Sequence, residues 1–142
     1  MECDSELGVS PSLRMVRAVP RRSLLEQVVV RVLDHDMRVY RISKGEPAEL
    51  DDFRSHYELA LPPRGIEDRA TVIHMAVSMF ETAERCWELI ERTNGRIGDR
   101  VAEVALVADR GVCVAKTGGP SHWSVWGRPA ELQSAIVDYA TR

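Results

Sequence analysis

The 142-residue sequence is poor in cysteine and aromatic residues and has no long apolar run. Its three cysteines are odd in number and widely spaced, which indicates reduced thiols rather than a disulfide framework or a zinc site: Cys3, Cys86 and Cys113. The apolar stretch from Leu24 to Leu33 is too short to cross a bilayer and is interrupted by Glu26 and Arg31. The N-terminus lacks the basic start and apolar run of a secretory signal. We therefore expect a cytoplasmic protein without a membrane span.

Several motifs of catalysis and binding are also missing. The sequence has no Walker phosphate-binding loop, no Gly-x-Gly-x-x-Gly fingerprint, no His-Glu-x-x-His zinc motif and no Gly-x-Ser-x-Gly nucleophile elbow. The four histidines are scattered and have no second type of ligand at metal-binding spacing, so we expect no metal. The formal net charge of -3 offers no general attraction to nucleic acid or anionic lipid, so we expect neither as a partner.

The composition that remains is that of a packed globular domain. Hydrophobic residues make up 44% of the chain and charged residues 29%. The length fits one domain, in which about two-thirds of the unfolded surface is buried on folding. Residues 1–22 mix acids, arginines and prolines without an apolar period, which predicts a poorly ordered leader. We therefore assign a single domain to residues 23–142.

The first half of this domain predicts two helices and two strands. The run from Leu24 to Leu33 suits a helix face or, through its consecutive valines, a strand, and we favour the helix. Residues 38–42 predict the first core strand. Pro47 then starts a short helix that ends before Pro62. Residues 72–80 predict a mostly buried strand.

The second half predicts a helix capped by Thr82, a β-hairpin, a strand and a last helix. The hairpin pairs strands at 101–107 and 112–115 across a short turn, and a strand follows at 122–126. Pro129 starts the last helix. Its expected buried side carries Leu132, Ala135, Ile136 and Tyr139. The predicted fold class is therefore α+β, a single domain with a mainly antiparallel sheet flanked by three or four helices.

Polar residues on the first two predicted core strands are candidates for a binding site. Arg41 offers a planar fork of donors suited to a pyrophosphate, and a salt-bridged or solvent-facing arginine is the structural alternative. His74 and Ser78 lie four residues apart on one predicted strand and would therefore share a face. Together they could offer hydrogen bonds to ribose or phosphate, or simply satisfy neighbouring backbone groups.

Three more candidates lie in the C-terminal third. Glu103 interrupts an apolar strand, where its carboxylate would stabilise positive charge developing on a ribosyl group or face water. Residues 116–127 combine permissive glycines with a histidine and two tryptophans, and this segment is the best candidate for the wall of a site. His122 and Trp123 would stack there on a base or nicotinamide ring, with core packing as the alternative role for the indole.

Two short motifs resemble a known family. The strand Arg-Val-Tyr-Arg-Ile at 38–42 and the later Val-Ser-Met-Phe-Glu-Thr at 77–82 resemble the start and middle of ADP-ribosyltransferase-like domains, including the RES-type toxin domains. The resemblance covers residues 37–139 in element order. It implies that a first-strand arginine holds NAD, a central-strand serine supports the nicotinamide ribose and a later acid assists transfer. The matching residues are Arg41, Ser78 and Glu103.

The chain also departs from the RES pattern. No Gly-Arg-Trp-Asn stretch follows the first strand, and the expected tyrosine is not evident. These departures affect the implied catalysis more than the implied fold, because folds often exchange their activities.

Two functions are therefore carried forward. The first is an ADP-ribosyltransferase-like domain that binds NAD or a related nucleotide and transfers ADP-ribose or hydrolyses NAD. Its catalytic residues would be Glu103 and Ser78, and its cofactor-binding residues Arg41, His74, His122 and Trp123. The alternative is a non-catalytic protein-interaction module, such as an immunity, antitoxin or scaffold protein. It would contact a protein partner through the tryptophan-rich strand and the Pro-Pro-Arg-Gly loop.

Overall fold

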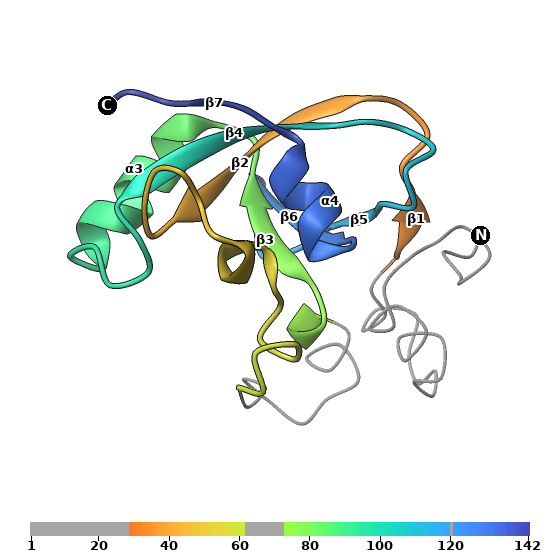
Figure 1. Cartoon of the computed structure of the whole chain (residues 1–142), viewed down its shortest axis with the longest axis horizontal. Helices are drawn as coiled ribbons and strands as arrows, with labels where there is room; N and C mark the ends of the chain where they lie inside the picture. Colours follow the sequence, from red (N-terminus) through yellow and green to blue (C-terminus); the bar gives the residue numbers. More distant parts are fainter. Residues whose placement is uncertain (1–28, 62–72, 120) are drawn as a thin grey trace.

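The structure, a computed structural model, describes residues 29–61, 73–119 and 121–142. Its main element is a seven-stranded sheet with the strand order β1-β5-β6-β3-β2-β4-β7 (Figure 1). Every neighbouring pair of strands is antiparallel. The strands are β1 (Arg31–Val32), β2 (Met37–Ser43), β3 (Val77–Phe80), β4 (Arg100–Leu106), β5 (Cys113–Lys116), β6 (His122–Trp126) and β7 (Ile136–Tyr139).

The described residues also form two α-helices, α3 (Ala83–Arg92) and α4 (Pro129–Ser134), and one 3-10 turn, η2 (Leu50–Phe53). The predicted α+β class with a mainly antiparallel sheet is confirmed at this level. The prediction of three or four helices is wrong for the described part of the chain, because segments predicted to be helical are a strand or a single turn.

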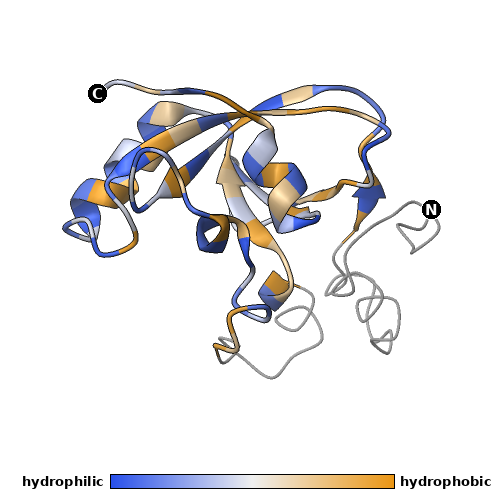
Figure 2. Cartoon of the chain, viewed as in Figure 1, coloured by the Kyte–Doolittle hydropathy of each residue, from blue (hydrophilic) through white to orange (hydrophobic). Residues whose placement is uncertain are grey.

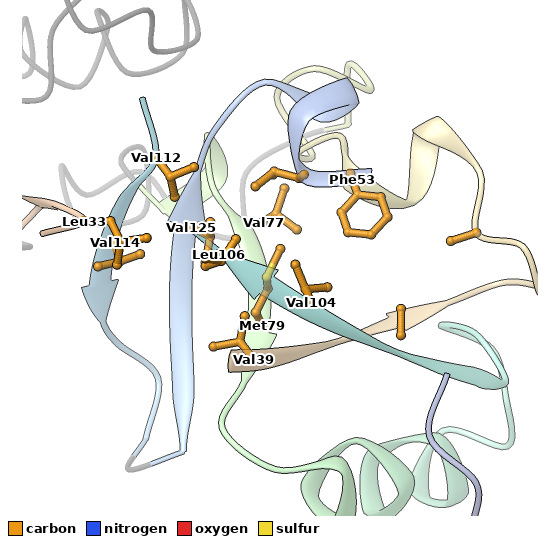
Figure 3. Close-up of a cluster of buried hydrophobic side chains, with 13 residues drawn as sticks. Leu33, Val39, Phe53, Val77, Met79, Val104, Leu106, Val112, Val114 and Val125 are labelled. Carbon is orange, nitrogen blue, oxygen red and sulfur yellow. The ribbon is translucent and has the colours of Figure 1, made fainter. Parts of the chain in front are cut away.

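Alternating side chains give the sheet two apolar faces. One face, which we call the α4 face, packs strand residues such as Val39, Met79 and Val104 against Phe53 of η2 and Leu132 of α4. Figure 3 shows these strand side chains converging beneath α4 from several strands. Burying each such side chain contributes roughly 1.5–3 kcal/mol to folding. This face therefore holds the largest core cluster.

The opposite face, which we call the α3 face, packs Ile42, Phe80 and Val101 against Cys86 and Ile90 of α3. Figure 2 shows hydrophobic and hydrophilic residues interleaved along α3, as expected for a helix with one buried side. A second apolar cluster lies further along this face, around Trp126, Cys113 and Ala115. Between the two clusters the strands carry polar side chains, which form the candidate site below.

The predicted start of α3 is confirmed in detail. Thr82 is the N-cap, and its hydroxyl accepts a hydrogen bond from the Arg85 N–H at 3.2 Å. The helix is followed by Gly95 with φ +74°, whose N–H donates to the Ile90 carbonyl at 2.9 Å. Both ends are therefore fixed by local sequence signals.

Two predictions in the first half need correction. The favoured helix at 24–33 is wrong where it can be judged, because residues 31–32 form β1 and pair with β5. The predicted strand at 72–80 begins only at Val77, and Ala76 instead closes a turn by donating to the Ile73 carbonyl. The predicted leader, residues 1–22, and the Pro-Pro-Arg-Gly loop lie outside the described residues.

The predicted hairpin of β4 and β5 is also wrong, although both strands exist. β4 pairs with β2 over seven residue pairs on one edge and with β7 on the other, so it has no edge left for β5. β5 pairs with β1 and β6. The connection between residues 107 and 112 therefore crosses to the far part of the sheet (Figure 1).

The last predicted helix is correct only at its start. α4 ends at Ser134, and the residues after it form β7 along the outer edge of β4. Ala135, Ile136 and Tyr139 do pack against the α4-face core, as the prediction required. The sequence therefore predicted correctly that these residues pack against the core, but it wrongly placed them all in a helix.

The cysteine prediction has a mixed outcome. Cys86 is a free, fully buried thiol, and burial raises its pKa to about 12. Cys113 is disulfide-bonded, so the expectation of reduced thiols is wrong for that residue. None of the helices within residues 29–61, 73–119 and 121–142 combines the length and apolar character that a membrane crossing requires.

Candidate functional site

The ladder between β2 and β3 ends after a single pair, next to the residues that the sequence marks as a site, and we call this gap in strand pairing the opening. These strands pair at a single position, Tyr40 opposite Phe80. Arg41 lies where the ladder stops, and its Nη1 donates to the Ser78 carbonyl at 3.0 Å. Its Nε donates to the Asp52 carbonyl at 2.7 Å. The guanidinium thus takes the place of ladder hydrogen bonds and joins β2, β3 and η2.

Arg41 has N–H donors that these two bonds do not use. Of the five N–H donors of a guanidinium, two are used in these bonds, which leaves three without a partner among the described residues. Burial lowers the pKa of Arg41, while the nearby Asp52 carboxylate acts in the opposite direction. A guanidinium nevertheless stays charged in proteins. The opening therefore holds one positive charge with unused donors.

Serine and threonine hydroxyls line the α3 face next to this opening. Ser78 of β3 and Ser124 of β6 lie directly opposite each other. The Ser124 hydroxyl is 2.7 Å from the Thr117 hydroxyl, and this pair is buried. No other described residue forms a hydrogen bond with the Ser78 hydroxyl, so Ser78 has donor and acceptor capacity to spare.

His122 lies on the same face, two residues before Ser124 on β6 and opposite Phe80. Its ring meets the edge of the Phe80 ring, with centroids 5.1 Å apart. Its Nδ1 lies 2.8 Å from the Thr117 carbonyl oxygen and 3.2 Å from the Thr117 hydroxyl. A carbonyl oxygen only accepts, so Nδ1 carries the proton and the neutral ring has its lone pair on Nε2.

The turn before β6 requires a glycine at position 118. Gly118 has φ +65°, which side chains rarely adopt, and a Cβ there would lie 3.1 Å from the Nδ1 of His122. The backbone therefore lies directly against the imidazole ring. The glycine-rich turn and the Thr117 carbonyl together fix the orientation of the ring.

Three cations influence the charge state of His122. Its pKa is lowered, first by burial and then by the charges of Arg41, Arg85 and Lys116, while the bond to the Thr117 carbonyl acts in the opposite direction. These three cations come from β2, α3 and β5. The site therefore holds a neutral imidazole near three cations, of which Arg85 and Lys116 are paired with Glu88 and Glu81.

Glu103 does not join this group. It lies on the same face, but Tyr40 and Phe80 stand between it and His122 in one row across four strands. Three strand spacings amount to roughly 14 Å. The Glu103 carboxylate forms an ion pair with Arg38 instead.

Trp123 lies on the opposite, α4 face and packs at the edge of the main core. Its Nε1 donates to a carboxylate oxygen of Glu81 at 3.2 Å. The Lys116 ammonium lies 5.0 Å from the centre of the indole ring and pairs with Glu81. Trp123 therefore belongs to a surface cluster with Lys116 and Glu81, and not to the hydroxyl-lined face.

His74 is separated from the site by the turn before β3. Because β3 begins at Val77, His74 and Ser78 do not share a strand, which corrects the predicted common face. The Nε2 of His74 lies 2.6 Å from the Leu61 carbonyl oxygen. The ring also meets Tyr57 edge to face, with centroids 5.9 Å apart.

The structure therefore brings the Arg41 guanidinium, which comes from the α4 face, to the Ser78 main-chain carbonyl, and it places the Ser78 and His122 side chains on the α3 face. Glu103, His74 and Trp123 lie elsewhere. The structure also places on the α3 face Ser124, which the sequence pattern did not single out, and Trp126, the second tryptophan of the segment 116–127. Ser124 and Trp126 follow His122 at a period of two, the signal that would have placed them on its face. The Trp126 Nε1 is buried and lacks a hydrogen-bond partner in the described part of the chain. No protein-family model matches this chain, and neither does any curated protein or solved structure.

Proposed function

We propose that this protein binds NAD or a related nucleotide at the opening between β2 and β3, as an ADP-ribosyltransferase-like domain would. The observation that carries the proposal is the Arg41 guanidinium held against the Ser78 carbonyl at 3.0 Å, with donors to spare, within the charged surroundings of His122. An arginine fork suits a pyrophosphate, and adjacent hydroxyls suit a sugar.

Each residue has a specific part in this proposal. The N–H groups of Arg41 that the main chain does not use bind the pyrophosphate. The Ser78 hydroxyl binds a ribose, and the His122 ring lies beside it on the next strand.

The proposal is limited to binding. Transfer of ADP-ribose or hydrolysis of NAD would require an acid to stabilise the developing ribosyl cation. Glu103, the acid that the sequence offers, is paired with Arg38 and would have to pass Tyr40 and Phe80 to reach His122. Catalysis at this site would therefore need a rearrangement of β4 side chains.

Calorimetric titration with NAD tests the proposal. We expect saturable binding by the wild-type protein and an affinity about tenfold lower for Ser78→Ala, which removes the hydroxyl and keeps the carbonyl that Arg41 needs. Arg41→Lys keeps the charge and loses the fork, so it should also weaken binding. Glu103→Gln is the matched control and should bind like the wild type.

Two results would sink the proposal. One is the absence of measurable heat at millimolar NAD from folded wild-type protein. The other is equal affinity of the wild type, Ser78→Ala and Arg41→Lys. Circular dichroism of each variant shows whether a loss of binding comes from a loss of fold.

A second candidate, a protein-interaction module, is favoured by the surface cluster of Trp123, Lys116 and Glu81. The Trp123 indole donates a hydrogen bond to Glu81 there, and the Lys116 ammonium lies over its ring. Tryptophan is also enriched among the residues that dominate binding energy at interfaces. One stoichiometric partner that co-purifies with the wild type and is lost with Trp123→Ala would support it. A single partner retained by Trp123→Ala would contradict it, as would a monodisperse chain that purifies alone.

A further inference from the structure

We infer that His122 accepts, through Nε2, a hydrogen bond from a ribose hydroxyl of the bound nucleotide, so that this residue recognises the sugar and not the phosphates. The inference rests on the proposed function and specifies what one side chain of that site does. It follows from the position of the ring proton, which the contacts with Thr117 determine.

The first step is the tautomer. The Thr117 carbonyl oxygen, 2.8 Å from Nδ1, accepts a hydrogen bond and cannot donate one. In the neutral ring Nε2 is therefore an acceptor. Phosphate oxygens are also acceptors, so a neutral His122 has no hydrogen bond to offer them. A sugar hydroxyl can donate, and it is the part of a nucleotide that matches.

The second step is the charge of the ring. The charged groups that bear on it are Arg41 from β2, Arg85 from α3 and Lys116 from β5, and all three disfavour an imidazolium. From β3 the apolar Phe80 ring lies edge-on to the imidazole. The acid at the end of that strand, Glu81, is paired with Lys116. No described carboxylate stabilises the protonated ring, so His122 is neutral at neutral pH.

The third step is the neighbour that completes the contact. Ser78 is the diagonal neighbour of His122 across β3 and β6, at a side-chain separation of about 7–8 Å. A group that bridges the two side chains must donate a hydrogen bond to the His122 Nε2. At its other end it can either accept from or donate to the Ser78 hydroxyl. A ribose diol meets this need, because one hydroxyl donates to Nε2 and the next accepts from Ser78. A single hydroxyl cannot make both contacts.

Titration of the full chain with NAD between pH 5 and pH 8 tests the inference. Protonation converts Nε2 from an acceptor into a donor, so we expect the affinity to fall about fivefold or more as the pH drops through the His122 pKa. If His122 contacted a phosphate, the added positive charge would instead raise the affinity on acidification. The two readings therefore predict opposite slopes.

Two substitutions isolate the nitrogen atom involved. His122→Gln places a neutral amide oxygen near the position of Nε2, so it should stay within about threefold of wild-type affinity and lose the pH dependence. His122→Asn reaches only the position of Nδ1, so its affinity should fall by about tenfold at every pH. Two NAD analogues, each lacking one hydroxyl of the nicotinamide ribose, complete the test. The analogue that loses the His122 contact should bind the wild type more weakly than NAD does, and should bind His122→Asn as well as NAD does.

The outcomes separate the two proposals. No binding of NAD by folded protein at any pH would sink the proposed function together with this inference. Binding that strengthens on acidification, or that is indifferent to both pH and His122→Asn, would leave nucleotide binding standing and overturn the role of His122. Circular dichroism at each pH excludes acid unfolding as the cause of weaker binding.

Discussion

Arg41 donates a hydrogen bond to the main-chain carbonyl of Ser78 at the point where β2 and β3 stop pairing. The two residues come from strands that are far apart in the sequence, and they meet through a side chain where a ladder bond would otherwise be. Arg41 therefore links β2 to β3 through its side chain, and it places a positive charge where the two strands stop pairing. This double role gives Arg41 a predictable effect on stability.

Replacing Arg41 with leucine should lower the free energy of unfolding by about 2–4 kcal/mol, because the carbonyls of Ser78 and Asp52 lose their donors. Urea unfolding followed by circular dichroism measures the change. Arg38→Leu on the same strand is the matched control. Its ion pair with Glu103 is exposed at the arginine, so the loss should stay below about 1 kcal/mol. Equal losses in the two variants would contradict the bridging role of Arg41.

Local signals predicted part of this fold well. The alternating pattern of β2 and β6, and the cap at Thr82, depend on neighbouring residues and were recognised. The hairpin of β4 and β5 and the final helix failed because their outcome depends on which strand occupies each edge of β4. Proximity in the chain favours a hairpin of β4 with β5, but β4 instead forms seven residue pairs with β2.

The candidate site shows the same limit. The sequence marked the segment that contains His122, and an alternation of two would have added Ser124. The contact between Arg41 and Ser78 has no local signal, because it depends on where the β2–β3 ladder ends. Sequence patterns therefore find candidate groups, whereas their convergence depends on long-range strand pairing.

Gly118→Ala should lower stability by roughly 1–2 kcal/mol, since an alanine must adopt φ +65° there. It should also displace the His122 ring, because the new Cβ would lie 3.1 Å from Nδ1. NMR chemical shifts of the imidazole nitrogens measure this displacement. Gly119→Ala is the control: its φ of +122° is strained as well, but nothing lies within 4 Å of a Cβ there. Identical His122 spectra for the two variants would show that the turn does not hold the ring.

The stability of the protein should depend on the protonation of His122. Its folded-state pKa is lowered, mainly by burial, so the unfolded chain binds the proton more readily. The contribution of His122 is therefore present in full above the unfolded pKa of about 6.5. It is lost as the pH falls through the folded pKa.

Urea unfolding at pH 7.5, 6 and 5 measures this dependence. The wild type should lose more stability on acidification than His122→Gln, which shares every other titrating group and lacks this one. An NMR titration of the ring should give a midpoint below 6.5. Parallel stability curves for the two proteins, or a midpoint above 6.5, would show that the ring is not buried among cations as described.

Tyr139→Phe should lower the free energy of unfolding by about 1–2 kcal/mol, because one buried donor loses its acceptor. The Tyr139 hydroxyl accepts a hydrogen bond from the Ala48 N–H at 2.7 Å, and Ala48 is only 5% exposed. This bond ties β7 to the segment that leads into η2, so amide exchange at Ala48 should also become faster. Tyr57→Phe is the control, since Tyr57 is 39% exposed and its hydroxyl has no partner among the described residues. If both variants unfold at the same urea concentration as the wild type, β7 does not anchor this segment through its tyrosine.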